Sequence, residues 1–268
     1  MWRRLRVMDR LILDVFNEDI GDFVSTLIPS TAVGRDWDPV LGEMLTVPCP
    51  SYFRVENKDM CYALDLEKVC RWVKDYPLDT VQRVLHAAFP ETRCWSFRPC
   101  DMSEPDSSLA RFFTWDISED AYSRYASSLA SATSVAVMVQ CPWILTKKDL
   151  HAFIHCRRLP RRRSEGERVQ YRSQERTWAK LWDFCSRRRC HYFIITNYSE
   201  WVFGAFTPGR TRAFVSPIKE FNDRGNEPTV LEALTFWVAS AIHLPKGNDL
   251  PPVLESVEDI LAEATVNI

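Results

Sequence analysis

The chain has 268 residues, of which 46% are hydrophobic and 26% are charged, and its formal net charge is −2. A globular chain of this size buries roughly 70–75% of its unfolded surface, so it needs neither a disulfide framework nor a metal to fold. Its 8 glycines include no Gly-x-Gly-x-x-Gly or Walker-type loop, which argues against the common nucleotide-binding motifs.

The first half of the chain is predicted to be mainly helical. Residues 1–28 carry apolar residues at helical spacing with acids between them, which predicts one or two helices and is unlike a secretory or transit signal. Residues 44–56 have β-rich patches around prolines and predict an irregular edge strand or extended loop. A helix over 64–76 is expected to end at Pro77, with Asp79 capping a second helix. Residues 94–108 are predicted to be loop.

Strands and helices alternate after residue 109. Residues 110–117 predict a strand, 119–132 a helix, and 134–140 a strand that is apolar on both faces and therefore buried. Thr146 and Asp149 have the spacing of a capping pair for the helix that follows them. A further helix begins near residue 173 and carries an apolar stripe. The stripe consists of Trp178, Leu181, Trp182 and Cys185.

The stretch HYFIITNYSEWVFGAFTPGRTRAFVSP (191–217) predicts a meander of three strands. Its first strand is apolar on both faces, and Pro208 and Gly209 occupy the central positions of a predicted type II turn. Thr229 and Glu232 predict a capping box for a final helix. The expected buried face of that helix is Leu231, Leu234, Val238, Ala241 and Ile242. These elements predict an α+β (mixed α/β) fold in which helices flank a central, mostly buried sheet.

We expect a single domain over residues 1–268, with an Arg-rich flexible insertion at about 157–172. A subdivision into a mainly helical part (1–108) and a sheet-containing part (109–268) is the alternative. No run approaches the ~20 apolar residues of a membrane span, so no membrane contact is expected. The 9 scattered cysteines predict reduced thiols in an intracellular protein, either cytoplasmic or nuclear.

The largest anomaly of charge lies between Arg157 and Arg189, where twelve Lys or Arg and four acids give a net charge of +8. One interpretation is an arm that binds the phosphates of nucleic acid. Its candidate residues are Arg157, Arg158, Arg161, Arg162, Arg163, Arg168 and Arg172. The alternative is a solvated loop or nuclear-import patch, with the arginines at 187–189 complementing the end of a helix.

Motifs for metal binding and catalysis are weak. His151 and His155 lie at i, i+4, and Cys185 and Cys190 flank the next helix end, so these four could surround zinc if the segments were adjacent. No Cys-x-x-Cys or Gly-x-Ser-x-Gly occurs, and we expect no catalytic residue, metal or other cofactor. Acids near residues 91–120 could hold Mg²⁺, although solvated loop acids are the simpler interpretation.

The segments WAKLWDFC, HYFIITNYSEWVFGAF, RAFVSP and PTVLEALTFWVASAI (within 178–242) resemble a family of uncharacterised proteins of mushroom-forming (basidiomycete) fungi. In that family a Trp-rich helix precedes a TNY..WVFG.F hairpin and a PTVLEAL.FWVAS helix, and VMVQCPWILTKKDL (137–150) is similar to the preceding segment. The resemblance covers about 110 residues and implies a fungal source.

The second half also resembles, more distantly, the PD-(D/E)XK nuclease superfamily. In that superfamily a strand bearing Glu-x-Lys is followed by a helix, by a strand of iLTN type and by a strand with the pattern w.f. Thr196 and Asn197 match the iLTN strand, and Trp201 and Phe203 match the w.f strand. The resemblance places Val139 at the position of the glutamate and Cys141 at the position of the lysine in that Glu-x-Lys strand. A valine cannot bind the metal, and a thiol cannot replace the lysine ammonium. Asp106 or Asp116 could stand for the first carboxylate. The resemblance therefore implies a nuclease-like scaffold without catalytic activity.

Three hypotheses follow. The first is a non-catalytic scaffold or interaction domain on a degenerate nuclease-like core. The second is a nucleic-acid binder that uses the segment from Arg157 to Arg172. The third is an enzyme whose site residues come together only in the fold. The expected partner is accordingly a protein or a nucleic acid.

Overall fold

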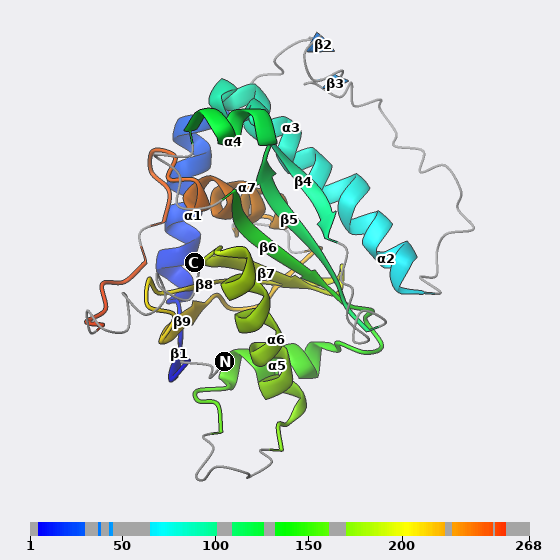
Figure 1. Ribbon diagram of the computed structural model, residues 1–268, viewed down its shortest axis with the longest axis vertical. Coiled ribbons are helices and arrows are strands. Elements are labelled where there is room, and N and C mark those ends of the chain that lie inside the picture. The colour runs from blue at the N-terminus through cyan, green and yellow to red at the C-terminus, as the bar shows by residue number, and fades with distance from the viewer. Residues whose placement is uncertain are drawn as a thin grey trace.

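The fold is known from a computed structural model (Figure 1). It describes residues 5–29, 37–38, 43–44, 65–100, 109–125, 132–160, 170–222, 227–248 and 250–255.

One eight-stranded mixed sheet organises the described chain. Its strands are β1 (Val7–Arg10), β4 (Trp95–Cys100), β5 (Arg111–Ile117), β6 (Thr133–Val139), β7 (Tyr192–Thr196), β8 (Glu200–Phe206), β9 (Arg212–Val215) and β10 (Lys219–Glu220). They lie in the order β1-β9-β8-β7-β6-β5-β4, and β10 pairs with β8. A separate antiparallel pair is formed by β2 (Trp37–Asp38) and β3 (Glu43–Met44).

The pairing directions divide the sheet into two meanders. The strands β4, β5 and β6 are antiparallel neighbours, and so are β7, β8 and β9. The meanders meet where β6 and β7 pair in parallel, with Val137 opposite Ile194. A parallel pair needs a crossover connection, and helices supply it here. The three-strand meander predicted over 191–217 is confirmed, as is the α+β class.

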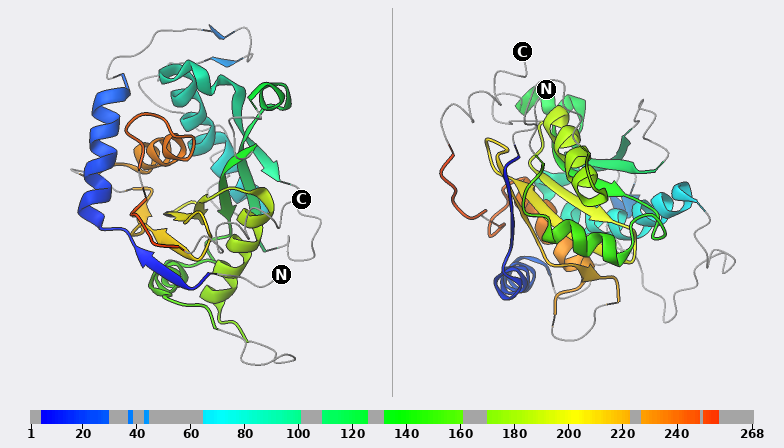
Figure 2. Two further views of the ribbon diagram at one scale, coloured as in Figure 1. Left: turned by 60° about the vertical axis from the view of Figure 1, so that its left-hand side comes forward. Right: turned by 90° about the horizontal axis from the view of Figure 1, so that it is seen from below.

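Helices cover both faces of the sheet. They are α1 (Leu13–Leu27), α2 (Leu66–Val73), α3 (Asp79–Ala88), α4 (Glu119–Tyr125), α5 (Lys147–His155), α6 (Ser173–Arg188) and α7 (Val230–Ala241). Buried residues of α1, α2, α3 and α7 form one hydrophobic cluster with the sheet, and buried residues of α5 and α6 form a second cluster on the other face. Figure 2 shows these layers on either side of the strands.

Burial on both faces explains the composition of the central strands. All five residues of β7 are buried, and in β6 the side chains alternate between the clusters, with Val135, Val137 and Val139 in the first and Ala136 and Met138 in the second. A strand covered on both sides carries apolar residues in succession. The prediction of buried central strands at 134–140 and 191–198 is confirmed.

The helix starts are predicted correctly where a capping box marks them. The Thr146 hydroxyl accepts from the backbone N–H of Asp149, and Thr229 makes the same contact with Glu232 at the start of α7. The buried face of α7 differs from the prediction because α7 lies against both the sheet and other helices. Phe236 and Trp237 are fully buried, whereas Leu231, which was expected inside, is 42% exposed.

Two predicted elements are wrong in type. Residues 7–10 form the strand β1 instead of helix, and residues 95–100 form the edge strand β4 instead of loop. Both strands lie at an edge of the sheet, and β4 contains Pro99, which an edge strand tolerates because it need not donate on both sides. Through β1 and β4, residues before 109 contribute strands to the same sheet as the later ones.

Two local predictions near proline and glycine are also wrong. Pro77 does not end the helix: a π-helical turn at Lys74–Leu78 joins α2 to α3, and the Asp79 carboxylate accepts from Lys74 Nζ. The turn at Pro208 and Gly209 closes with a hydrogen bond from Arg210 N to Thr207 O, but the positive φ falls on Arg210 (52°) and not on Gly209. It is therefore not a type II turn.

Among the described residues, no helix is long and apolar enough to cross a membrane.

Candidate functional site

The carboxyl end of β6 is the place to which the nuclease resemblance points. Val139 is 0% exposed and Cys141 is 2% exposed, and both belong to the first hydrophobic cluster. An isopropyl group offers no ligand atom, and a thiol has no permanent charge, so these two side chains cannot hold a metal and position a water as an acid and a lysine do.

A second thiol lies beside Cys141. Burial raises the pKa of Cys70 on α2 to about 12, against the opposing effect of Arg111, and Cys141 is among the neighbours that add to the rise. Burial also raises the pKa of Cys141, with a contribution from Asp65. A thiol is nucleophilic and binds metal only as the thiolate, so the raised pKa values disfavour the reactive form of both cysteines.

Asp116, one of the two acids proposed to stand for the first carboxylate, does not lie at this end of β6. Asp116 pairs with Thr133 at the opposite end of the strand, and six residues of strand, roughly 20 Å, separate Thr133 from Val139. Its carboxylate accepts hydrogen bonds from the hydroxyls of Thr114 (2.7 Å) and Thr133 (2.6 Å). Asp116 is a structural hydrogen-bond acceptor. Asp106 lies outside the described residues.

The four metal-ligand candidates do not come together. His151 and His155 are exposed on α5, where His155 Nδ1 contacts the carbonyl O of His151 (2.7 Å) and its Nε2 contacts Arg10 Nη1 (3.3 Å). Cys185 and Cys190 are buried in the second hydrophobic cluster. The helices α5 and α6 are neighbours, as the zinc hypothesis requires, but the two histidines are exposed to solvent whereas the two cysteines are buried in the core. Within the described ranges, no three His, Cys, Asp or Glu side chains are grouped to hold a metal ion.

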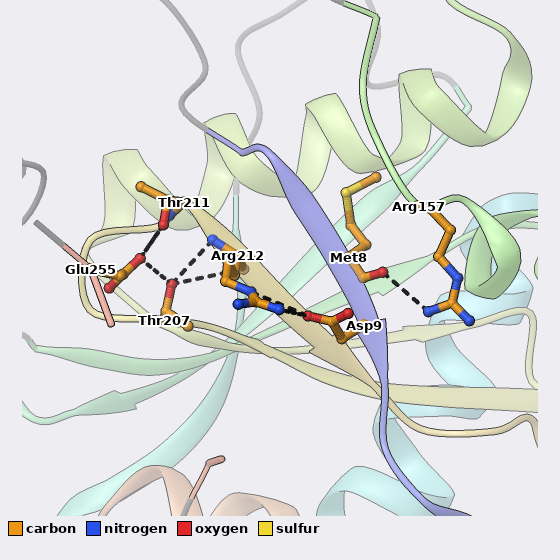
Figure 3. A network of polar contacts seen from close by, with 7 residues as sticks. All are labelled: Met8, Asp9, Arg157, Thr207, Thr211, Arg212 and Glu255. Carbon is orange, nitrogen blue, oxygen red and sulfur yellow. Dashed lines mark hydrogen bonds and ion pairs between the residues drawn. The ribbon is translucent and has the colours of Figure 1, made fainter. Parts of the chain in front are cut away.

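Three arginines of the basic segment are described, and all are exposed. Arg157 follows α5 and binds the edge of the sheet: its Nη1 donates to Met8 O (3.3 Å), and its own carbonyl O accepts from Met8 N (3.0 Å) (Figure 3). Arg172 precedes α6, with its backbone N–H capped by Glu175. Arg158 also lies just after α5. The candidates Arg161, Arg162, Arg163 and Arg168 lie outside the described residues.

Sequence patterns missed a row of three aromatic rings at the surface. Trp72 on α2 contacts Tyr198 (ring centroids 5.5 Å apart), and Tyr198 stacks with Phe221 (6.4 Å). Phe221 is 61% exposed, and the Lys68 ammonium lies 5.8 Å from the Trp72 ring centroid. The three rings come from a helix, a turn and the end of β10, so no single stretch of sequence contains the row.

Tyr198 has an unusual backbone at the centre of this row. Its φ is 80°, a region that bulky L-residues rarely adopt and that costs free energy. The conformation is fixed by hydrogen bonds: Tyr198 N donates to the Thr196 hydroxyl (2.8 Å), and Tyr198 O accepts from Trp201 Nε1 (2.9 Å). The turn holds this ring at the surface despite the strain.

A carboxylate-binding turn is the second feature that the sequence did not reveal. The Glu255 carboxylate accepts hydrogen bonds from the backbone N–H groups of Gly209 (2.7 Å) and Thr211 (3.2 Å). It also accepts from the hydroxyls of Thr207 (2.6 Å) and Thr211, and Figure 3 shows these two threonines beside it. Burial by itself would raise the pKa of Glu255, but these hydrogen bonds lower it by more. The donors lie within five residues of one another, whereas their acceptor is 44 to 48 residues away.

The same hairpin holds two further titratable groups. Arg210 is 1% exposed and donates from Nη1 to Cys190 O (2.7 Å). His191 contacts Thr207 O through Nδ1 (3.2 Å), and burial, with Arg210 as the second cause, lowers its pKa to about 4. The side chains of Arg210 and His191 both make hydrogen bonds that support the hairpin. The lowered pKa means that His191 is neutral at pH 7.

Comparison with known proteins adds no family. A scan against protein-family models, a search of curated proteins and a search of solved structures each found no match.

Proposed function

We propose that this protein is a non-catalytic scaffold or interaction domain built on a degenerate nuclease-like core, and that it acts inside the cell. The observation that carries the proposal is the burial of Val139 and Cys141 at the end of β6. They occupy the positions where the resemblance requires an acid and a lysine, and the adjacent Cys70 is also an un-ionised thiol.

The order of elements supports the nuclease-like part of this proposal. The resemblance requires a strand, a helix and then a strand of iLTN type followed by a w.f strand. In the fold β6 is followed by α5 and α6, by β7 with Thr196 at its end, and by β8 with Trp201 and Phe203. The crossover makes β7 a parallel neighbour of β6, so the position of the missing Glu-x-Lys lies next to Thr196.

The aromatic row supports the interaction part. Trp, Tyr and Phe are enriched in the centres of protein interfaces because they bury much area at little cost in side-chain entropy. Tyr198 keeps a strained backbone conformation at the surface of the molecule. Backbone strain of this kind is often found at functional positions.

A cleavage assay tests the proposal. The purified full chain is incubated with plasmid, duplex and single-stranded DNA and with RNA, in Mg²⁺ or Mn²⁺, beside the variants Asp106→Asn and Asp116→Asn. We expect no cleavage by any of the three proteins. Metal-dependent cleavage by the original chain that disappears in either variant would overturn the proposal, because it would identify a working carboxylate.

The second candidate function is binding of nucleic acid through the segment from Arg157 to Arg172. The exposure of Arg157 and Arg158 just after α5, and of Arg172 just before α6, favours it. Phosphate contacts make affinity fall steeply with salt. The measurement is fluorescence anisotropy with labelled duplex and single strands between low and moderate salt. An affinity that hardly changes with salt, or that survives replacing these arginines by glutamine, would remove this candidate.

A further inference from the structure

The turn from Thr207 to Thr211 has the properties of an anion-binding site. Two backbone N–H groups, of Gly209 and Thr211, point to the same carboxylate, with Arg210 between them at a φ of 52°. A turn that contains a left-handed residue can direct several of its backbone N–H groups into one concavity, which is a recurrent way to bind anions. The hydroxyls of Thr207 and Thr211 complete a set of four donors on this one turn.

Gly209 makes the close approach possible. A Cβ at this position would lie 3.1 Å from the carboxyl carbon of Glu255 and from both of its oxygens. The glycine therefore favours the close contact with the anion, and its own φ is not in the left-handed region.

The described residues just before Glu255 are mostly exposed. Pro251 and Pro252 are exposed, and Leu254 is fully exposed, so the carboxylate makes the main contact of this stretch with the hairpin. Ordering five residues costs conformational entropy of the same size as the hydrogen bonds can return. The attachment is thus only slightly favourable, so Glu255 occupies the turn most of the time and another oxyanion of similar geometry can replace its side chain.

We propose that the turn from Thr207 to Thr211 is a binding site for an oxyanion, a carboxylate or a phosphate group, that Glu255 of the same chain fills as a built-in competitor. Binding of the external group releases residues 251–255 from the hairpin. The site shares no residue with the end of β6 or with the segment from Arg157 to Arg172, so the proposal does not depend on either proposed function.

Amide resonances of the turn test the proposal directly. The full ¹⁵N-labelled chain is titrated with inorganic phosphate, and separately with acetate, at constant ionic strength held with chloride, while the amide signals of Gly209 and Thr211 are followed. The variant Glu255→Gln removes the competing charge. The variant Glu227→Gln is the matched control, because Glu227 is a half-exposed carboxylate 3.9 Å from Lys219 and remote from the turn.

In Glu255→Gln we expect the signals of both amides to shift and to saturate as anion is added. The anion concentration at the midpoint should be about tenfold lower than in the original chain, because there Glu255 fills the site about nine-tenths of the time. Glu227→Gln should titrate like the original chain. Adding Thr211→Val to Glu255→Gln should abolish saturation. A response to phosphate alone assigns a phosphate ligand, and a response to acetate alone assigns a carboxylate. No saturable shift with either anion in Glu255→Gln, or equal midpoints with and without Glu255, would overturn the proposal.

Discussion

The indole N–H of Trp182 on α6 donates a hydrogen bond of 3.1 Å to the backbone carbonyl O of Arg210. This contact joins the second helical layer to the hairpin turn that binds Glu255, and both residues are almost fully buried. The carbonyl belongs to the residue with positive φ, so one tryptophan supports the turn at its most strained point.

Replacing Trp182 by phenylalanine is expected to leave that buried carbonyl without its donor, which costs roughly 1–3 kcal/mol beyond the loss of volume. Trp115→Phe is the matched control, because Trp115 is also fully buried but its Nε1 has no hydrogen-bond partner among the described residues. Urea unfolding measures both. Equal losses of stability in the two variants would contradict the role given to the Trp182 bond.

Two glycines should respond to alanine in opposite directions. A Cβ at Gly204 on β8 would lie 2.3 Å from Phe193 Cζ and 2.9 Å from the carbonyl O of Phe214, whereas at Gly21 on α1 it would meet nothing within 4 Å. We expect Gly204→Ala to destabilise by about 1–3 kcal/mol through overpacking. Gly21→Ala should stabilise α1 by up to about 1 kcal/mol. Thermal or urea unfolding distinguishes the signs, and a stable Gly204→Ala protein would mean that the sheet packs differently here.

The backbone strain at Tyr198 is measurable with a pair of truncations. Tyr198→Ala and Tyr198→Gly both remove the ring from the aromatic row, but only glycine adopts a φ of 80° without steric cost. We expect the glycine variant to be more stable than the alanine variant by about 1 kcal/mol. At an ordinary strand position such as Val202 the order should reverse. If the alanine variant were more stable than the glycine variant at position 198, the positive φ would not be present in solution.

His191 should make the folded state less stable as the pH falls. Burial, and then Arg210, lower its pKa in the folded chain to about 4 from a reference value of 6.5, so below pH 6.5 protons bind the unfolded chain more readily. The stabilisation is complete above the unfolded pKa, is lost progressively between pH 6.5 and about 4, and amounts to about 3 kcal/mol at most.

The variant His191→Asn keeps a donor for Thr207 O and removes the titration. The measurement is the free energy of unfolding in urea at several pH values, taken as the difference between the two proteins. Glu255 also faces His191, and its lowered pKa causes a loss of stability at still lower pH. The comparison between pH 6.5 and 5 therefore isolates the histidine. An equal slope in both proteins over that range would refute the assignment.

The buried thiols at the end of β6 should resist alkylation. Because burial raises the pKa of Cys70 to about 12, its thiolate is scarce at pH 8. We expect iodoacetamide to modify Cys94, which is only half-buried, well before Cys70 and Cys141, and to modify all three rapidly in urea. Peptide mass spectrometry gives the order. Early modification of Cys70 in the native protein would mean that it is an activated thiol, which would favour an enzyme over a scaffold.

Sequence patterns by themselves determined the features that depend on neighbours along the chain. The apolar run FIIT predicts a strand buried on both faces, and the pairs Thr146/Asp149 and Thr229/Glu232 predict helix starts. Each rests on contacts within about four residues, or on a period that reports burial directly. The α+β class follows from the same patterns.

The tertiary structure alone decided what depends on residues far apart. The strands β1 and β4 lie at the edges of the sheet. The partner of β1 is β9, far along the chain, and the apolar pattern of β4 is interrupted by Pro99. The aromatic row joins Trp72 to Tyr198, and the turn at Thr207 takes its anion from Glu255. Long-range contacts form when the free energy gained by packing exceeds the entropy lost on closing large loops. No local sequence pattern encodes that balance. For this reason the elements were largely predictable and the candidate sites were not.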